Sequence, residues 1–173
     1  MFTFPEVAVT APQSVAFLIF VAPLCLYVAW NDLRAMKIPT WSTDALAIVF
    51  VVVGFVLTMM GEFTWAEYGW RYVHFIVVLI AAMIANAVGA MGAGDSKFLA
   101  SAAPFVALSD AGFVFMLLAI GMFVGFFVHR AARSIKPIRN LVPDWQSWED
   151  KRRFPMGFPM GVVLIVYLAI PLF

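Results

Sequence analysis

The sequence is poor in the residues that hold soluble, metal-binding or disulfide-bonded domains together. Only 12% of its 173 residues are charged, and it contains one cysteine and two histidines. The single cysteine, Cys25, excludes a disulfide within the chain and a zinc site built on cysteines, and we interpret it as a packing residue. His74 and His129 lie at the ends of predicted helices and form no ligand cluster. We therefore expect neither a metal nor a cofactor.

Apolar residues are what the chain has in abundance. They make up 64% of the sequence, and the mean hydropathy is +0.97, which is typical of a membrane protein that crosses the bilayer several times. A helix needs about 17 to 25 apolar residues to cross. Six runs contain no Asp, Glu, Lys or Arg: residues 7–31, 45–61, 72–94, 98–109, 111–128 and 154–173.

These runs predict an all-α integral membrane protein with about six transmembrane helices in one domain, residues 1–173. Five runs are long enough to span outright. The fourth run is short and contains Pro104, so we expect the preceding loop, MGAGDSK at 91–97, to complete that crossing. The N-terminus lacks the basic region of a secretory signal, and residues 14–30 are predicted to be a retained helix.

The distribution of basic residues predicts the orientation in the membrane. Ten of the eleven Lys and Arg residues fall in the first, third and fifth loops, and basic loops mark the cytoplasmic side. Both termini are therefore predicted to be extracytoplasmic, in a cytoplasmic (inner) membrane. The basic fifth loop, residues 129–153, is long enough for an interfacial helix, with Trp145 and Trp148 at headgroup level. We expect it to contact anionic lipids rather than nucleic acid.

Most of the ten acidic residues have ordinary explanations. We interpret seven of them as solvated charges: Glu6, Glu62, Glu67 and Asp110 on outward segments, and Asp144, Glu149 and Asp150 among the basic residues of the fifth loop. Asp44 precedes an apolar run and is predicted to cap its helix. Asp32 and Asp95 remain, at the predicted cytoplasmic ends of the first and fourth helices, where an ionisable group is a candidate for function.

Glycines surround one of these two aspartates. Gly92 and Gly94 remove side chains beside Asp95, which permits unusual backbone dihedrals and the close approach of another segment. Two neighbouring aspartates tend to hold one proton between them, so that one accepts a proton from water while the other donates to a carbonyl oxygen. This is the minimum for peptide hydrolysis without a metal. The 63 residues between Asp32 and Asp95 neither require nor forbid their contact.

The same residues resemble a known family. Gly92-Ala-Gly-Asp95 is similar to the GxGD signature of intramembrane aspartyl proteases, and the extension GAGDSKFLA resembles the type IV prepilin peptidases. Asp32, six residues before Ile38-Pro39, is similar to the D-x5-I-P-N pattern of that family, although Thr40 replaces the usual Asn. The segment FPMGFPMGV resembles the family's Pro-aromatic-Gly-Pro motif, in either of two alignments.

The resemblance implies an aspartic endopeptidase that removes the short basic leader of prepilin-like precursors at the cytoplasmic face. Asp32 and Asp95 are then the catalytic pair, with Gly92, Gly94 and Lys97 in supporting roles. Larger relatives carry two CxxC pairs that bind zinc and an N-methyltransferase activity. This chain resembles the small, peptidase-only form of the Tad/Flp or Cpa pilus systems and of preflagellin peptidases.

Some assignments stay open in the sequence. Lys97 either makes a hydrogen bond near the aspartates, tuning their charge, or extends to the membrane interface. Asn86 either donates to the GxGD loop or bridges two helices, and we favour bridging. The alternative functions are a proton- or ion-coupled transporter subunit and a non-catalytic scaffold for pilus assembly.

Overall fold

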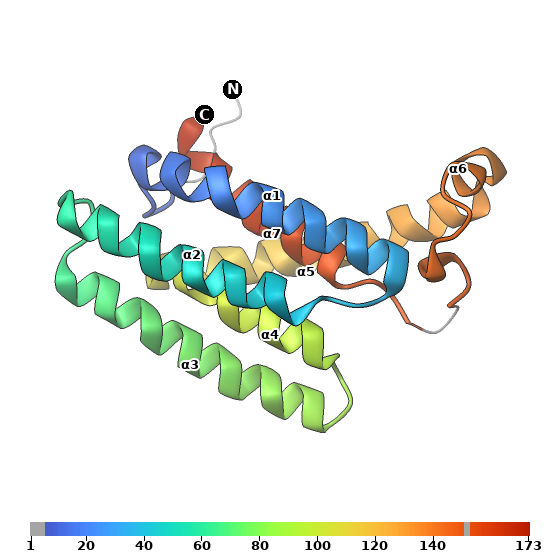
Figure 1. Ribbon diagram of the computed structural model, residues 1–173, viewed down its shortest axis with the longest axis horizontal. Coiled ribbons are helices and arrows are strands. Elements are labelled where there is room, and N and C mark those ends of the chain that lie inside the picture. The colour runs from blue at the N-terminus through green and yellow to red at the C-terminus, as the bar shows by residue number, and fades with distance from the viewer. Residues whose placement is uncertain (1–5, 151–152) are drawn as a thin grey trace.

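The chain forms a bundle of helices that run roughly along one axis, as the computed structural model shows (Figure 1). The structure describes residues 6–150 and 153–173, and no strand occurs within them. The helices are α1 (Ala11–Ala35), α2 (Thr40–Met59), α3 (Trp65–Ala87), α4 (Ala93–Ala102), α5 (Ala111–Ser134), α6 (Lys136–Leu141) and α7 (Gly157–Ala169). Single 3₁₀ turns at Ala103–Phe105, Leu108–Asp110, Gln146–Trp148 and Ile170–Leu172 complete the secondary structure.

Local sequence signals explain the helix boundaries. Thr10 caps α1 and Thr64 caps α3, each in a capping box with the residue three positions later, an arrangement that satisfies free N–H groups of the first turn. Met36 ends α1 in a left-handed conformation, with φ at 53°. Pro39 immediately precedes α2. A proline at this position cannot continue α1 into the next helix.

Each of the six predicted apolar runs corresponds to a helix, and the all-helical prediction is confirmed. Four segments are long and apolar enough to cross a membrane: Ala11–Ala35, Thr40–Met59, Trp65–Ala87 and Leu108–Ser134. The last run forms a shorter apolar helix, Gly157–Leu172, although we predicted that it would span outright. The fourth run is divided between the ten-residue α4 and the 3₁₀ turn that contains Pro104.

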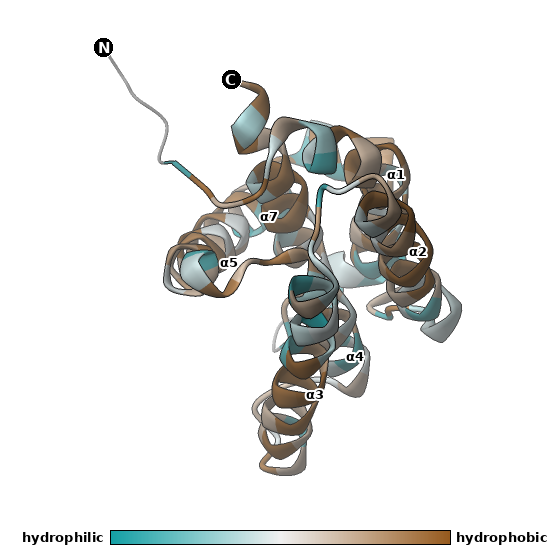
Figure 2. Cartoon of the chain, turned by 90° about the vertical axis from the view of Figure 1, so that its left-hand side faces the viewer, coloured by the Kyte–Doolittle hydropathy of each residue, from teal (hydrophilic) through white to brown (hydrophobic). Residues whose placement is uncertain are grey.

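The core lies where α1, α2 and α7 meet α4 and the turn that follows it. Phe17, Phe50 and Phe105 form its centre, with the Phe105 ring edge-on to Phe17 at 5.0 Å and to Phe50 at 5.4 Å between centroids. Helices α1 and α7 lie side by side (Figure 1). Figure 2 shows apolar stretches of α2 and α3 along the outside of the bundle, and such an exposed apolar surface suits a lipid environment.

Two predictions for acidic residues are wrong. Asp44 does not cap α2, because that helix begins four residues earlier at Thr40 and leaves Asp44 exposed on its second turn. Asp110 is not a solvated charge: it is 7% exposed, and its carboxylate accepts hydrogen bonds from the Tyr167 hydroxyl and the backbone N–H of Ala8. These partners replace the water that a buried carboxylate loses.

The basic stretch 129–153 does not form a single interfacial helix but contains several short elements. Its first part continues α5 as far as Ser134, and α6 covers only six residues. Trp148 is buried: its ring stacks on His129 at 5.1 Å and on Trp145 at 5.3 Å. Lys151 and Arg152, which the orientation count also used, lie outside the described residues.

Candidate active site

Asp32 is held at the end of α1 by the first turn of α7. Its side chain is buried, and Oδ2 accepts a hydrogen bond from the backbone N–H of Gly157 at 2.7 Å. The backbone N–H of Phe158 also donates to this carboxylate. Both donors belong to the N-terminus of α7, where free N–H groups and the helix dipole favour an anionic partner. The last apolar helix therefore orients an aspartate that lies 125 residues earlier in the chain.

Asp95 lies in the first turn of α4 and is partly buried. The backbone N–H of Gly92 donates to its carboxylate. A Cβ atom at Gly92 would lie 2.7 Å from Asp95 Oδ2, closer than a real Cβ contact allows. The absence of a side chain at Gly92 therefore leaves space for the aspartate to fold back over the turn.

The two carboxylates lie at the same end of the bundle, near enough for Asp95 to act electrostatically on Asp32. Ile38 packs between their supporting helices. A Cβ at Gly94 would be 3.2 Å from Ile38 Cβ, and one at Gly157 would be 2.8 Å from Ile38 Cδ1 and 3.0 Å from Asp32 Oδ2. Glycine at both positions thus lets α4 and α7 approach the loop that follows α1.

Side-chain hydrogen bonds order the two loops that lead to this site. The amide of Asn31 donates to the carbonyl of Lys37 at 2.7 Å, and the amide of Asn86 donates to the carbonyl of Met91 at 2.8 Å. Asn86 therefore bonds to the GxGD loop, the alternative that we did not favour. The bond between helices is made by Ser96, whose hydroxyl donates to the carbonyl of Ala82 at 3.0 Å.

Lys97 contacts the start of α2. Its Nζ donates to Thr40 Oγ1 at 3.3 Å, which joins α4 to the residue that replaces the usual Asn after Ile38-Pro39. Within the described ranges no ion pair connects Lys97 to either aspartate. Of the two roles considered for Lys97, the structure gives a hydrogen bond close to the site, on a side chain that remains exposed.

Sequence reasoning missed the part of the site that α7 provides. The segment FPMGFPMGV fits the family motif in two alignments, and the sequence does not distinguish between them. The structure shows that Gly157 is the residue that donates its N–H to Asp32. No local sequence pattern indicates which distant side chain the N–H groups at the start of a helix will bind. Among residues 6–150 and 153–173, no three His, Cys, Asp or Glu side chains are grouped as metal ligands.

Comparison with known proteins identifies the family of this chain. The model of the type IV leader peptidase family matches residues 19–129, a segment that includes both Asp32 and Asp95 but not Gly157. No curated protein and no solved structure matches the chain. Because the match covers more than half of the sequence, and the apolar helices indicate a membrane protein, the chain belongs to the type IV leader peptidase family.

Proposed function

We propose that the protein is an intramembrane aspartyl endopeptidase in which Asp32 and Asp95 are the catalytic pair. The observation that carries this proposal is the position of the two carboxylates, which come from α1 and α4 to one end of the bundle, where Gly94 beside Asp95 and Gly157 beside Asp32 both lie close to Ile38. Like charges at short range favour a state in which the pair shares one proton. Such a pair supplies one base and one acid at the same place.

The pair needs no further chemical group to hydrolyse a peptide bond. The ionised carboxylate takes a proton from a water molecule, whose oxygen attacks the carbonyl carbon of the substrate. The protonated carboxyl donates its proton to the carbonyl oxygen, which gives a neutral tetrahedral intermediate. When the C–N bond breaks, the carboxyl that took the proton from water donates it to the leaving nitrogen. The other carboxylate accepts a proton from a hydroxyl of the intermediate as the new C=O bond forms, and both carboxyls regain their starting states.

The substrate of this proposal is a type IV prepilin-like precursor, cut between a short basic leader and the apolar helix that follows. Six crossings, counting α4 with its following turn and α7, would place Asp32 and Asp95 at the cytoplasmic face and both termini outside. A basic leader suits a site with two acidic side chains. We assign the protein to the peptidase-only form, as in Tad-type pilus systems, without N-methyltransferase activity.

Processing of a precursor in cells tests the proposal. A prepilin from the same genome is expressed with the wild-type protein, with Asp32→Asn or with Asp95→Asn, and the mature pilin is followed by its change in mass. Both variants should accumulate in the membrane and leave the precursor uncut. Asp44→Asn is the matched control, because Asp44 is exposed on α2, and it should cut like the wild type. Full processing by either active-site variant would overturn the proposal.

A further inference from the structure

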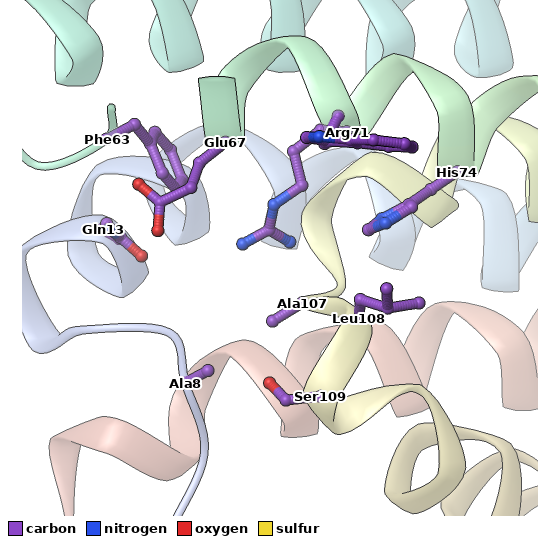
Figure 3. Close-up of a pocket in the computed structure, with 10 residues that line it drawn as sticks. Ala8, Gln13, Phe63, Glu67, Arg71, His74, Ala107, Leu108 and Ser109 are labelled. Atoms are coloured by element: carbon purple, nitrogen blue, oxygen red, sulfur yellow. The ribbon is translucent and has the colours of Figure 1, made fainter. Parts of the chain in front are cut away.

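A second polar site lies at the end of the bundle opposite to Asp32 and Asp95. It is a cavity of about 400 Å³ between α1, α3 and the segment that leads into α5. Figure 3 shows the guanidinium of Arg71 pointing into this cavity, with Glu67 and His74 from the same helix on either side of it. The peptidase mechanism uses none of these residues.

The charge of Arg71 is buried without a close partner of opposite sign. Arg71 is 8% exposed, and its Nη1 donates to the carbonyl of Pro104 at 3.3 Å while its Cζ lies 5.4 Å from the Phe63 ring centre. No carboxylate in the described part of the chain lies within 4.0 Å of it. The nearby carboxylate of Asp110 already accepts from Ala8, Ser109 and Tyr167. A buried cation of this kind favours an added anion.

Glu67 adds a negative charge at the rim of the same cavity. Its Oε2 accepts from the backbone N–H and the hydroxyl of Thr64, both at 2.8 Å, which fixes the carboxylate on the first turn of α3. A simple anion at Arg71 would therefore lie near a carboxylate that repels it. A ligand with a phosphate and, a few bonds away, an ammonium group matches both charges.

An apolar hollow continues from the cavity along α3. It has a volume of about 250 Å³, is lined by Trp65, Ala66, Gly69, Trp70 and Val73, and shares Trp70 with the Arg71 cavity. Trp65 and Trp70 are more than half exposed, and exposed tryptophans at a helix end are typical of the level of lipid headgroups. Beyond the hollow, exposed apolar side chains follow α3 towards its other end: Ile76, Val77, Ile80, Met83 and Ile84.

We propose that this cavity binds the headgroup of a zwitterionic phospholipid of the phosphatidylethanolamine type. Arg71 binds the phosphate, Glu67 binds the ammonium, and an acyl chain lies in the hollow over Gly69. In the topology proposed above, the lipid belongs to the extracytoplasmic leaflet. The lipid site is separate from Asp32 and Asp95, so a test of lipid binding does not depend on whether the proposed peptidase reaction is correct.

Native mass spectrometry of the detergent-purified protein tests this inference. Phosphatidylethanolamine, phosphatidylglycerol and diacylglycerol with identical acyl chains are added in turn, and the bound fraction is measured. Wild type should retain phosphatidylethanolamine best and diacylglycerol least. Arg71→Gln should lower the binding of both phospholipids roughly tenfold, whereas Arg34→Gln, the same change at an exposed arginine of the opposite end, should not. Equal retention of the three lipids by the wild type would overturn the proposal.

Two further variants keep the test decisive if Arg71→Gln does not fold. Glu67→Gln retains an oxygen for the capping box but removes the charge, so it should abolish the preference for phosphatidylethanolamine over phosphatidylglycerol. Gly69→Leu fills the hollow at a position where a Cβ meets no atom within 4 Å, and it should weaken lipid binding while the protein stays folded. Wild-type lipid binding in both variants would contradict the site.

Competition with a soluble compound distinguishes a lipid from a free ligand. O-phosphoethanolamine carries the same two charges without acyl chains. Because the proposed site includes the apolar hollow, short-chain phosphatidylethanolamine should displace the bound lipid at much lower concentration than O-phosphoethanolamine. Displacement by both compounds at the same concentration would mean that the cavity takes a soluble phosphate compound, and the lipid assignment would be wrong.

Discussion

The carboxylate of Asp32 depends on a residue that has no side chain. Gly157 donates its N–H to Oδ2 and leaves the space in which that oxygen lies, since a Cβ there would be only 3.0 Å away. The first turn of α7 therefore determines both the position and the hydrogen bonding of Asp32. A methyl group at this position would move the carboxylate without changing any ionisable group.

Gly157→Ala should reduce precursor cleavage about 100-fold, because a displacement of about 1 Å at a reacting group has effects of that order. The measurement is the initial rate of cleavage by purified protein, together with its thermal unfolding midpoint. Gly112→Ala is the control, because a Cβ on the first turn of α5 meets no atom within 4 Å, and its rate should equal that of the wild type. A wild-type rate in Gly157→Ala would show that this contact has no role in the reaction.

Individual carboxylates also show how far sequence reasoning reaches. The predicted topology puts Asp32 and Asp95 at the same ends of two helices, and the structure brings both to one end of the bundle. A short outward loop predicts a solvated Asp110, yet the residue is buried and accepts hydrogen bonds from Tyr167 and Ala8. Its partners are 57 and 102 residues away in sequence, so no local pattern indicates them.

At the level of helices, the contact between α1 and α7 determines the position of Asp32 in the candidate active site. Gly161 lies against the backbone of α1, where a Cβ would be 2.8 Å from the carbonyl oxygen of Cys25. A backbone atom cannot rotate away, so any side chain at this position separates the two helices. This separation would also displace Asp32 on α1 from its partner Gly157, which lies one turn before Gly161 on α7.

Gly161→Ala should therefore lower the free energy of unfolding by about 1 to 3 kcal/mol, the usual range for overpacking in a core. Unfolding of the protein in detergent, followed by circular dichroism, measures the change. The Gly112→Ala control should keep or slightly raise the stability, because alanine favours a helix more than glycine does. If Gly161→Ala is as stable as the control, the close packing of α1 on α7 is not a stabilising contact.

The beginning of α3 shows that a local capping signal, rather than the first residue of an uncharged run, determines where a helix starts. The run 72–94 predicts a helix that begins after Arg71, but α3 starts seven residues earlier, at Trp65, behind the capping box of Thr64 and Glu67. Within this helix the side chain of Arg71 is buried, with the carbonyl of Pro104 and the ring of Phe63 as partners. A count of charges along the sequence treats such an arginine as a loop residue.

At the scale of the whole molecule, composition predicts a membrane protein, and the positions of the basic residues predict its orientation. The four long apolar helices agree with the first prediction. We propose the orientation from the basic loops and the number of crossings from the six apolar runs, two of which form the shorter helices α4 and α7. The two ends of the bundle differ in chemistry, with the aspartate pair at one and Arg71 at the other.

Thiol labelling tests the orientation. Single cysteines at the exposed positions Lys37, Ala90 and Gly61 are introduced into a Cys25→Ser background and treated with a membrane-impermeant maleimide. The variant at Gly61 should be labelled in intact cells, whereas those at Lys37 and Ala90 should be labelled only after the membrane is opened. Labelling of Lys37→Cys and Gly61→Cys from the same side would contradict the proposed topology.

The central claim is that Asp32 and Asp95 act as one catalytic unit, and the cleavage rates of purified Asp32→Asn, Asp95→Asn and the double variant test it most directly. Each single change should reduce the rate by about 10³-fold or more, because acid–base groups contribute on this order. The double variant should lose no more than the worse single variant, as expected for residues that act together. A single variant that cuts at the wild-type rate, or losses that multiply in the double variant, would contradict the account.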